Sequence, residues 1–241
     1  MLAVDLGRRS GEPERLDVEP SDPAAIEACL RDLERINRWT AAYRVTLRWL
    51  DQLLCATRPA RPLTILDVGC GRGDMLRRIW TWGRRRGLEL RLIGIDLNPH
   101  ATAAAAAATP DEAPIRYVTA NAFDMQHDPP ADVVVSALFA HHLDDACLVR
   151  FLRWMEERTR LGWLINDLHR HPLPYLVARG GAPLLRMHPF VRHDAPLSVA
   201  RAFDRRDWVR LLDAAGLAPP ATTIRWRLPF RFAVGRIKPA C

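Results

Sequence analysis

Three glycines at alternate positions follow an apolar run in the segment TILDVGCGRGDML, residues 64–76. They are Gly69, Gly71 and Gly73, and Asp67 precedes them. Glycine adopts backbone conformations that other residues avoid, and it has no side chain to block a close approach. The spacing therefore predicts a sharp turn against which a small molecule lies.

Two common phosphate-binding patterns do not fit this segment. A G-x-G-x-x-G dinucleotide loop requires a third glycine, but the corresponding position is Asp74 counted from Gly71 and Leu76 counted from Gly73. Asp74 is an anion where a pyrophosphate would arrive. The G-x-x-x-x-G-K-[ST] pattern is also absent, because Lys238 is the only lysine in the chain. The predicted ligand is therefore not a phosphate group.

Alternating strands and helices position this loop. Apolar runs predict strands, and the segments between them predict helices. The predicted strands are 63–68, 90–96, 114–120, 131–138 and 162–167, and the predicted helices are 73–86, 99–108 and 144–159. Continuous apolar strands separated by helices are typical of a parallel sheet that is covered on both faces. We therefore expect a doubly wound α/β fold, in which ligands bind at the carboxyl ends of the strands.

The flanking segments complete the predicted architecture. A capped helix over 203–217 ends at Gly216, and TTIRWRLPFRFAVGRI predicts two paired strands that add an antiparallel edge to the sheet. We thus expect a mostly parallel seven-stranded sheet. The predicted units are a loose tail (1–20), a helical cap (21–57) and the α/β domain (58–241), which carries a lid insertion over 169–197 after the fifth strand. Apolar residues at a 3/4 spacing predict the helices of the cap, beginning at Ser21 or Asp22.

Four elements at successive strand ends carry a family resemblance. They are the D-x-G-x-G-x-G loop from Asp67 to Gly73, Asp96 at the end of the second strand, the pair Asn121 and Ala122 after the third, and SALFAHHL after the fourth. Over residues 63–168 the chain resembles the class I S-adenosylmethionine-dependent methyltransferases. The resemblance implies that the glycine loop surrounds the methionine end of S-adenosylmethionine, whose cationic groups suit an acid such as Asp67.

The same resemblance implies a set of cofactor contacts. Asp96 accepts the two ribose hydroxyls, and Asn121 and Ala122 lie against the adenine. Tyr43 and Arg44 of the cap close over the methionine carboxylate, with helix packing and a surface ion as the alternative for these two. The complete predicted set is Asp67, Gly69, Cys70, Gly71, Gly73, Asp96, Leu97, Asn121, Ala122, Ser136 and Arg44.

The acceptor is predicted from what the sequence lacks. Amide and exocyclic-amine methyltransferases carry [DN]-P-P-[YFW] after the fourth strand, where this chain has SALF, and the Pro-Cys pair of the cytosine-C5 enzymes is absent. The chain resembles the small-molecule branch that includes the ubiquinone and menaquinone methyltransferases. RHDAPLSVARAF is similar to methyltransferases encoded near type III polyketide synthases, whose products are phenolic. We expect O-methylation of a small aromatic hydroxylated molecule.

Two other functions stay open at this stage. One is an RNA or protein methyltransferase that uses the basic surface, and the other is a cofactor-binding module without catalysis. Affinity for RNA that falls steeply with salt would favour the first. Cofactor binding without turnover on any acceptor would favour the second.

Six of the eight histidines fall between residues 141 and 193. We interpret them as a polar rim with one proton acceptor. His142, after the fourth strand, and His169, after the fifth, are the best candidates for that base, with His141 beside them. Asp167 orients a histidine or the substrate. The spacing lacks cysteine ligands and an H-x-x-x-H pair, so we predict no metal site.

Composition limits location and partners. The 241 residues carry a formal net charge of +7, almost all of the positive charge from arginine, and we expect a small-molecule acceptor rather than nucleic acid. Five scattered cysteines, no apolar run long enough to span a membrane and a polar N-terminus predict a reduced, cytoplasmic protein. The sequence leaves the oligomeric state open.

Overall fold

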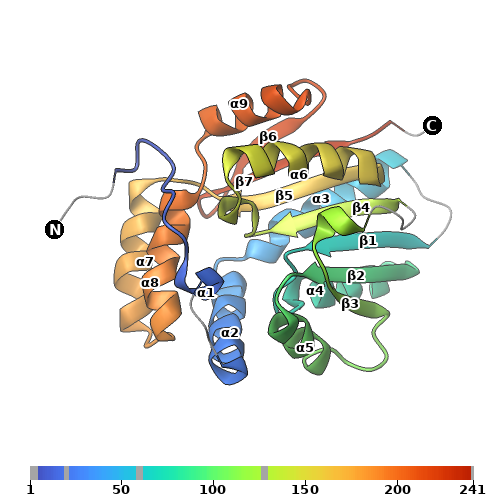
Figure 1. Ribbon diagram of the computed structural model, residues 1–241. Helices are drawn as coiled ribbons and strands as arrows, with labels where there is room; N and C mark the ends of the chain where they lie inside the picture. The colour runs from blue at the N-terminus through green and yellow to red at the C-terminus, as the bar shows by residue number, and fades with distance from the viewer. Residues whose placement is uncertain (1–4, 19–21, 58–61, 126–129, 240–241) are drawn as a thin grey trace.

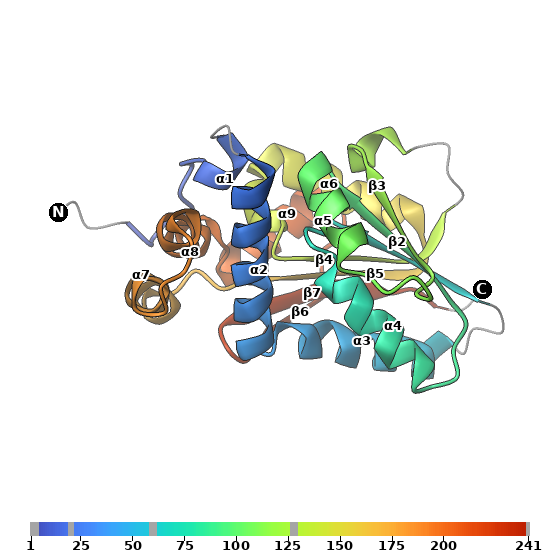
Figure 2. The same ribbon diagram turned by 90° about the horizontal axis from the view of Figure 1, so that it is seen from below.

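The computed structural model describes residues 5–18, 22–57, 62–125 and 130–239. Seven strands form one sheet with helices on both of its faces (Figures 1 and 2). The strands are β1 (Leu63–Val68), β2 (Leu90–Asp96), β3 (Ile115–Thr119), β4 (Ala131–Ala137), β5 (Thr159–Leu168), β6 (Thr223–Arg227) and β7 (Arg231–Ile237). The helices are α1 (Arg15–Val18), α2 (Pro23–Trp39), α3 (Ala42–Thr57), α4 (Asp74–Arg84), α5 (Pro99–Ala107), α6 (Asp145–Arg158), α7 (Pro172–Leu184), α8 (Pro189–Arg201) and α9 (Arg205–Ala215).

The strand order is β3-β2-β1-β4-β5-β7-β6. β1 to β5 are parallel, whereas β7 pairs antiparallel with both β5 and β6. This order confirms the predicted fold class, including the antiparallel edge. The chain progresses outward in opposite directions from β1 and β4, and the glycine loop leaves β1 at this switch point, where ligands of such sheets bind.

Each face of the sheet has its own apolar core. On one face, Leu53 of α3 and Leu76 of α4 pack with Ile65 of β1. On the other face, Phe151 of α6 and Trp208 of α9 pack with residues of the central strands. The central strands β1 and β4 are mostly apolar and buried because both of their faces are covered.

The predicted helical cap consists of α2 and α3. Asp22 begins α2, and its side chain accepts a hydrogen bond from the backbone N–H of Ala25, as the sequence signal at Asp22 and Pro23 predicts. α3 packs under β5 and β7, whereas α2 runs past α5 and α8 (Figure 2).

The predicted insertion after β5 is a helical hairpin formed by α7 and α8. A small apolar core joins this hairpin to α2 through Cys29, Ala182, Met187 and Val191. The hairpin extends to Arg201, four residues beyond the predicted end of the insertion. It lies beyond the carboxyl edge of the sheet, beside α1 and α2 (Figure 1).

Residues 5–18 are packed, which corrects the prediction of a loose tail for this part of the chain. Asp194 of α8 accepts hydrogen bonds from the backbone N–H groups of Arg15 (3.0 Å) and Leu16 (3.1 Å), and Glu14 is only 4 % exposed. The contacts are made by single polar groups rather than by a repeating apolar face. The segment therefore carries no periodic signal in the sequence.

None of the helices in the described ranges has the length and apolar character that a membrane span requires.

The packing of α9 predicts a difference between two of its residues. Leu211 is fully buried, whereas Val209 on the same helix is 44 % exposed. Leu211→Ala should lower the free energy of unfolding by about 2–5 kcal/mol because it leaves a cavity. Val209→Ala should change it by less than about 0.5 kcal/mol. Urea denaturation of both variants measures this difference, and equal losses would show that α9 does not pack as described.

Candidate functional site

The glycine loop turns with three left-handed residues. The φ angles are 72° at Gly69, 50° at Gly71 and 71° at Gly73. A Cβ on Gly69 would lie 2.6 Å from the ring of Phe139, and a Cβ on Gly73 would collide with the hydroxyl of Tyr117. At Gly71 the nearest atom would be 3.7 Å away. Neighbouring rings thus leave no space for a side chain at Gly69 and Gly73, whereas there is space at Gly71.

Two buried acids lie beside this loop. Asp96 accepts hydrogen bonds from the backbone N–H groups of Gly71 and Asn98, both at 2.9 Å. Burial nevertheless raises the pKa of Asp96. Asp67 is 2 % exposed, and its Oδ1 atom has no hydrogen-bond partner in the described structure. Burial and the nearby charges of Asp74 and Asp96 raise the pKa of Asp67 well above its usual range.

The other predicted cofactor residues differ in where they lie. Leu97 is 67 % exposed directly after Asp96, which is unusual for a large apolar side chain at the end of a buried strand. Asn121 follows β3 and caps a short 3-10 turn by accepting a hydrogen bond from Phe123 N–H, and Ala122 begins that turn. The Cys70 backbone N–H donates to Ile95 inside the loop.

Ser136 lies at the start of the loop, whereas Arg44 points away from it. The hydroxyl of Ser136 donates to the carbonyl of Val68, the residue before Gly69, at 3.0 Å. Arg44 lies exposed on α3. Its neighbour Tyr43 points inward instead and donates to Asp74 Oδ2 at 2.7 Å, which fastens the helical cap to the start of α4.

His141 and Asp167 form a buried pair at the ends of β4 and β5. His141 Nδ1 lies 2.7 Å from Asp167 Oδ1, and the backbone N–H of His141 donates to Oδ2. Burial acts to raise the pKa of Asp167, but the attraction and hydrogen bond of His141 outweigh it, so the pKa is lowered. Asp167 therefore orients a histidine, and that histidine is His141 rather than His142 or His169.

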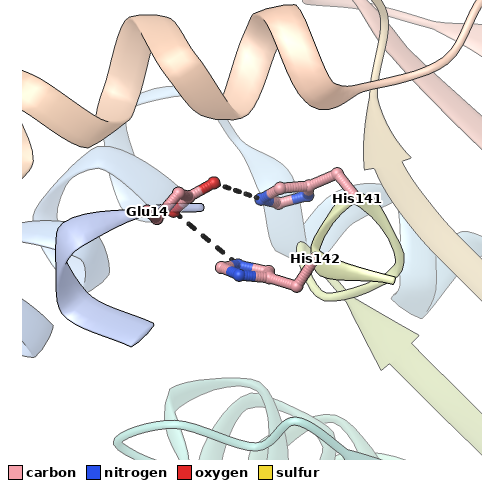
Figure 3. Close-up of side chains that lie close together, drawn as sticks. All are labelled: Glu14, His141 and His142. Atoms are coloured by element: carbon pink, nitrogen blue, oxygen red, sulfur yellow. Dashed lines mark ion pairs between the residues drawn. The ribbon is translucent and has the colours of Figure 1, made fainter. Parts of the chain in front are cut away.

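His142 is held by the N-terminal segment. Its Nδ1 atom lies 2.6 Å from Asp17 Oδ2. Burial acts to lower the pKa of His142, but the hydrogen bond to Asp17 and the carboxylates of Glu14 and Asp167 outweigh it and raise the pKa. The Nε2 atoms of His141 and His142 both face Glu14, as Figure 3 shows, at 3.6 Å and 3.8 Å.

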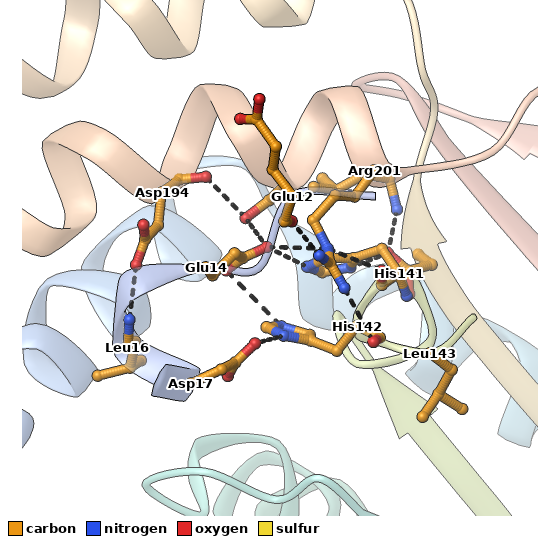
Figure 4. Close-up of polar contacts among 12 residues, drawn as sticks. Glu12, Glu14, Leu16, Asp17, His141, His142, Leu143, Asp194 and Arg201 are labelled. Carbon is orange, nitrogen blue, oxygen red and sulfur yellow. Dashed lines mark hydrogen bonds and ion pairs between the residues drawn. The ribbon is translucent and has the colours of Figure 1, made fainter. Parts of the chain in front are cut away.

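Arg201 of α8 closes the site from above the two histidines (Figure 4). Its guanidinium donates to the backbone carbonyls of Glu12, His141 and His142. Glu14, Asp17 and Arg201 were not predicted as site residues. Two of them lie in a polar segment without periodicity, and the third lies on a hairpin whose course the sequence does not show.

His169 lies apart from this cluster, among aromatic residues of the β6–β7 edge. Its Nδ1 atom accepts a hydrogen bond from Trp226 Nε1–H at 3.2 Å, and its ring packs on Phe230 and Phe232. Burial and the neighbouring His171 lower the pKa of His169 in spite of Asp204.

Arg231, at the start of β7, is another residue that sequence patterns did not reveal. It is 2 % exposed, and Nη2 donates to Thr40 Oγ1 at 3.0 Å, while Nε and Nη1 have no partner in the described structure. Burial lowers its pKa to about 10 in spite of the nearby Asp167 and Tyr43. Arg231 is thus a buried cation at the carboxyl edge of the sheet, near Asp167 of β5.

Comparisons with known proteins agree with the fold. Residues 65–162 match the family described as a methyltransferase domain. No curated protein matches the chain.

Solved structures share the fold over most of the chain. The plantazolicin methyltransferase BpumL in complex with S-adenosylhomocysteine is 13% identical, with a TM-score of 0.66 and 93% of both chains covered. Magnesium protoporphyrin IX methyltransferase from Synechocystis PCC 6803, with the same bound product, is 11% identical, with a TM-score of 0.53 and coverage of 83% of this chain and 82% of that chain. Human N-acetylserotonin methyltransferase, in complex with S-adenosylmethionine, is 16% identical, with a TM-score of 0.62 over 91% of this chain and 57% of that chain.

The domain match and the shared fold confirm the resemblance to class I methyltransferases. The ubiquinone and menaquinone branch stays a prediction.

The surroundings of His169 predict its titration. We expect its pKa to lie below about 6.5, so that the ring is neutral at pH 7. The unfolded chain then takes up this proton first, and the folded state loses stability as the pH falls below about 6.5. Trp226→Phe removes a donor to the neutral ring and should raise the pKa. Proton NMR of the imidazole measures both values, with Trp39→Phe, at another exposed tryptophan, as the control. An unchanged pKa in Trp226→Phe would contradict the described hydrogen bond.

Proposed function

We propose that this class I methyltransferase transfers the methyl group of S-adenosylmethionine to an oxygen atom of a small, aromatic hydroxylated molecule. The observation that carries the cofactor half of the proposal is the glycine loop with its two acids, which lies at the switch point of the sheet. The acceptor half rests on the polar cluster at the ends of β4 and β5.

The residues at the loop fit this cofactor. Asp96 uses one lone pair of each oxygen on a backbone N–H group and keeps others for the ribose hydroxyls. Leu97 offers an exposed apolar surface to the adenine. The unpartnered Oδ1 of Asp67 suits the cationic methionine end, because a buried acceptor without a partner is costly. When bound, the cofactor supplies a methyl group on a positively charged sulfur.

The acceptor hydroxyl belongs at the cluster of Glu14, His141 and His142. Methyl transfer is an in-line displacement, so the protein has to position the acceptor, exclude water and ease the ionisation of its hydroxyl. The Nε2 atoms of both histidines can ease the ionisation of the hydroxyl, either by taking its proton or by holding a cation beside its oxygen. Residues 5–18 lie over this cluster, where Glu14 and His141 are buried. His169 is too deeply engaged with the β6–β7 edge to share this role.

A large acidic partner such as RNA is less well supported. Many arginines are committed to internal contacts: Arg72 and Arg77 pair with Glu34, and Arg9 pairs with Asp145. Paired arginines leave fewer free charges to follow a phosphate backbone. The similar structures are of methyltransferases named for plantazolicin, magnesium protoporphyrin IX and N-acetylserotonin, which supports a small acceptor.

Asp96 provides the direct test of the cofactor site. Asp96→Asn keeps the size of the side chain but removes the charge that strengthens hydrogen bonds to the ribose. Each such bond is worth about 1.5–3 kcal/mol, so the affinity for S-adenosylhomocysteine should fall by at least about tenfold. Isothermal titration calorimetry measures it.

Asp111→Asn is the matched control, because Asp111 is an exposed acid in the turn after α5. It should bind like the wild type. Equal affinities of Asp96→Asn and the wild type, with both proteins folded by circular dichroism, would remove Asp96 from the site and with it the proposed cofactor position.

A further inference from the structure

Three side chains from distant parts of the sequence converge at the covered end of the site. Glu14 comes from the N-terminal segment, and His141 and His142 come from the turn between β4 and α6 (Figure 3). One potential ligand atom from each lies within 4.8 Å of the others, and they are the one such group in the described residues. Glu14 and His141 are buried, and His142 is half-buried.

The hydrogen bonds of the two histidines fix where their protons lie. Each Nδ1 faces a carboxylate, Asp167 at 2.7 Å for His141 and Asp17 at 2.6 Å for His142. An ionised carboxylate only accepts hydrogen bonds, so each Nδ1 carries the proton and donates it. Nε2 is then the ring atom of each histidine that is left to bind another group. Both Nε2 atoms face the carboxylate of Glu14.

The two Nε2 atoms and the carboxylate of Glu14 thus face one another without a hydrogen bond between them. A charged imidazolium would form a bond of about 2.7–2.9 Å with a carboxylate. The observed separations are longer: 3.6 Å from His141 Nε2 to Glu14 Oε1 and 3.8 Å from His142 Nε2 to Glu14 Oε2. Two ligands of one tetrahedral zinc ion, each about 2.0–2.1 Å from the metal, lie about 3.3 Å apart. The spacing is therefore close to that of groups which share a cation, and too wide for groups that share a proton.

The groups that are hydrogen-bonded to the three side chains also resemble those around a metal site. Histidines that bind metals almost always donate their other N–H to a carboxylate or carbonyl, which fixes the ring. Asp17 and Asp167 do this for both rings. Ser198 holds Glu14 by donating to Oε1 at 2.8 Å. The guanidinium of Arg201 donates its hydrogen bonds to backbone carbonyls, and its Nε atom lies 3.9 Å from Glu14 Oε1 (Figure 4).

We propose that Glu14, His141 and His142 hold one divalent transition-metal ion of the zinc type, through a carboxylate oxygen of Glu14 and both Nε2 atoms. Two imidazoles and one carboxylate suit zinc or cobalt rather than magnesium or calcium, which prefer oxygen ligands alone. Asp17 and Asp167 are positioning residues. The ion fastens residues 5–18 to the β4–α6 turn. If the proposed function holds, its remaining coordination position is available to the acceptor oxygen.

This site differs from the prediction of no metal. The prediction considered histidine and cysteine spacing within the sequence. Here the third ligand comes from the N-terminal segment, far from the histidines in the sequence, and the fold brings it close.

The test is a titration of the full-length, cofactor-free protein with Co²⁺ and Zn²⁺ after removal of metals with EDTA. Visible absorption of Co²⁺ reports on its coordination, and calorimetry gives the affinity for Zn²⁺. We expect one ion per chain. Glu14→Gln and His142→Gln should each lower the affinity at least about 100-fold, and Asp17→Asn, which keeps all three ligands, should lower it about 10- to 100-fold.

His100→Gln is the matched control, because His100 is exposed at the start of α5 and lies outside the cluster. It should bind like the wild type. Thermal unfolding of each metal-free variant checks that it is folded, and added Zn²⁺ should raise the transition temperature of the wild type but not of Glu14→Gln.

The proposal is overturned if Glu14→Gln and His142→Gln bind as tightly as the wild type. It is also overturned if Co²⁺ shows the charge-transfer absorption of a thiolate ligand, which would place the ion at a cysteine such as the exposed Cys55. Neither readout involves methyl transfer. A failure of the proposed function would therefore leave this result unchanged.

Discussion

The turn after β1 depends on two residues, Gly69 and Gly73, at which neighbouring rings leave no room for a Cβ. The ring of Phe139, from the turn after β4, occupies the space that a side chain at Gly69 would need, and Tyr117 of β3 does the same at Gly73. Asp96 at the end of β2 accepts a hydrogen bond from the backbone N–H of Gly71. The ends of four strands are therefore packed around one loop, and the position of every group in the site depends on that packing.

Buried charge is the second feature on which the site depends. Glu14 of the N-terminal segment and Asp167 are buried beside two histidines and Arg201, and the more exposed Asp17 pairs with His142. Removing carboxylates from water is costly unless positive charge and hydrogen bonds compensate. Here the imidazoles, the guanidinium and the backbone N–H groups provide part of that compensation, and a bound cation would provide more. The same interactions hold residues 5–18 in place, so closure of the site and its electrostatics are linked.

The sequence predicted what local patterns determine. The strand limits 63–68 and 90–96 agree with β1 and β2, because a strand buried on both faces is a continuous apolar run between clear breaks. The glycine loop and Asp96 could be located for the same reason, since they lie at the ends of such runs. These elements are fixed by residues close together in the chain.

The rest of the site depends on contacts between distant segments. Glu14 lies beside His141 in a segment whose backbone is bound by Asp194 of α8. The contact therefore depends on the hairpin of α7 and α8. Arg231 is buried because β7 inserts between β5 and β6, an order that no local pattern shows. His142 and His169 were predicted as bases because they follow strand ends, and that role stays a prediction. The structure pairs Asp167 with His141, whose backbone N–H and ring both face the carboxylate.

We propose that the protein methylates a small hydroxylated acceptor at the carboxyl edge of its sheet. The most direct measurement supplies S-adenosylmethionine with an isotopically labelled methyl group to the protein, with Zn²⁺ in the buffer, in separate reactions with a library of phenolic compounds, with total RNA and with protein extract. Mass spectrometry then locates the label. We expect label on an oxygen of a small phenol, with S-adenosylhomocysteine formed in equal amount. Label found only in RNA or protein, or no S-adenosylhomocysteine with any acceptor, would contradict it.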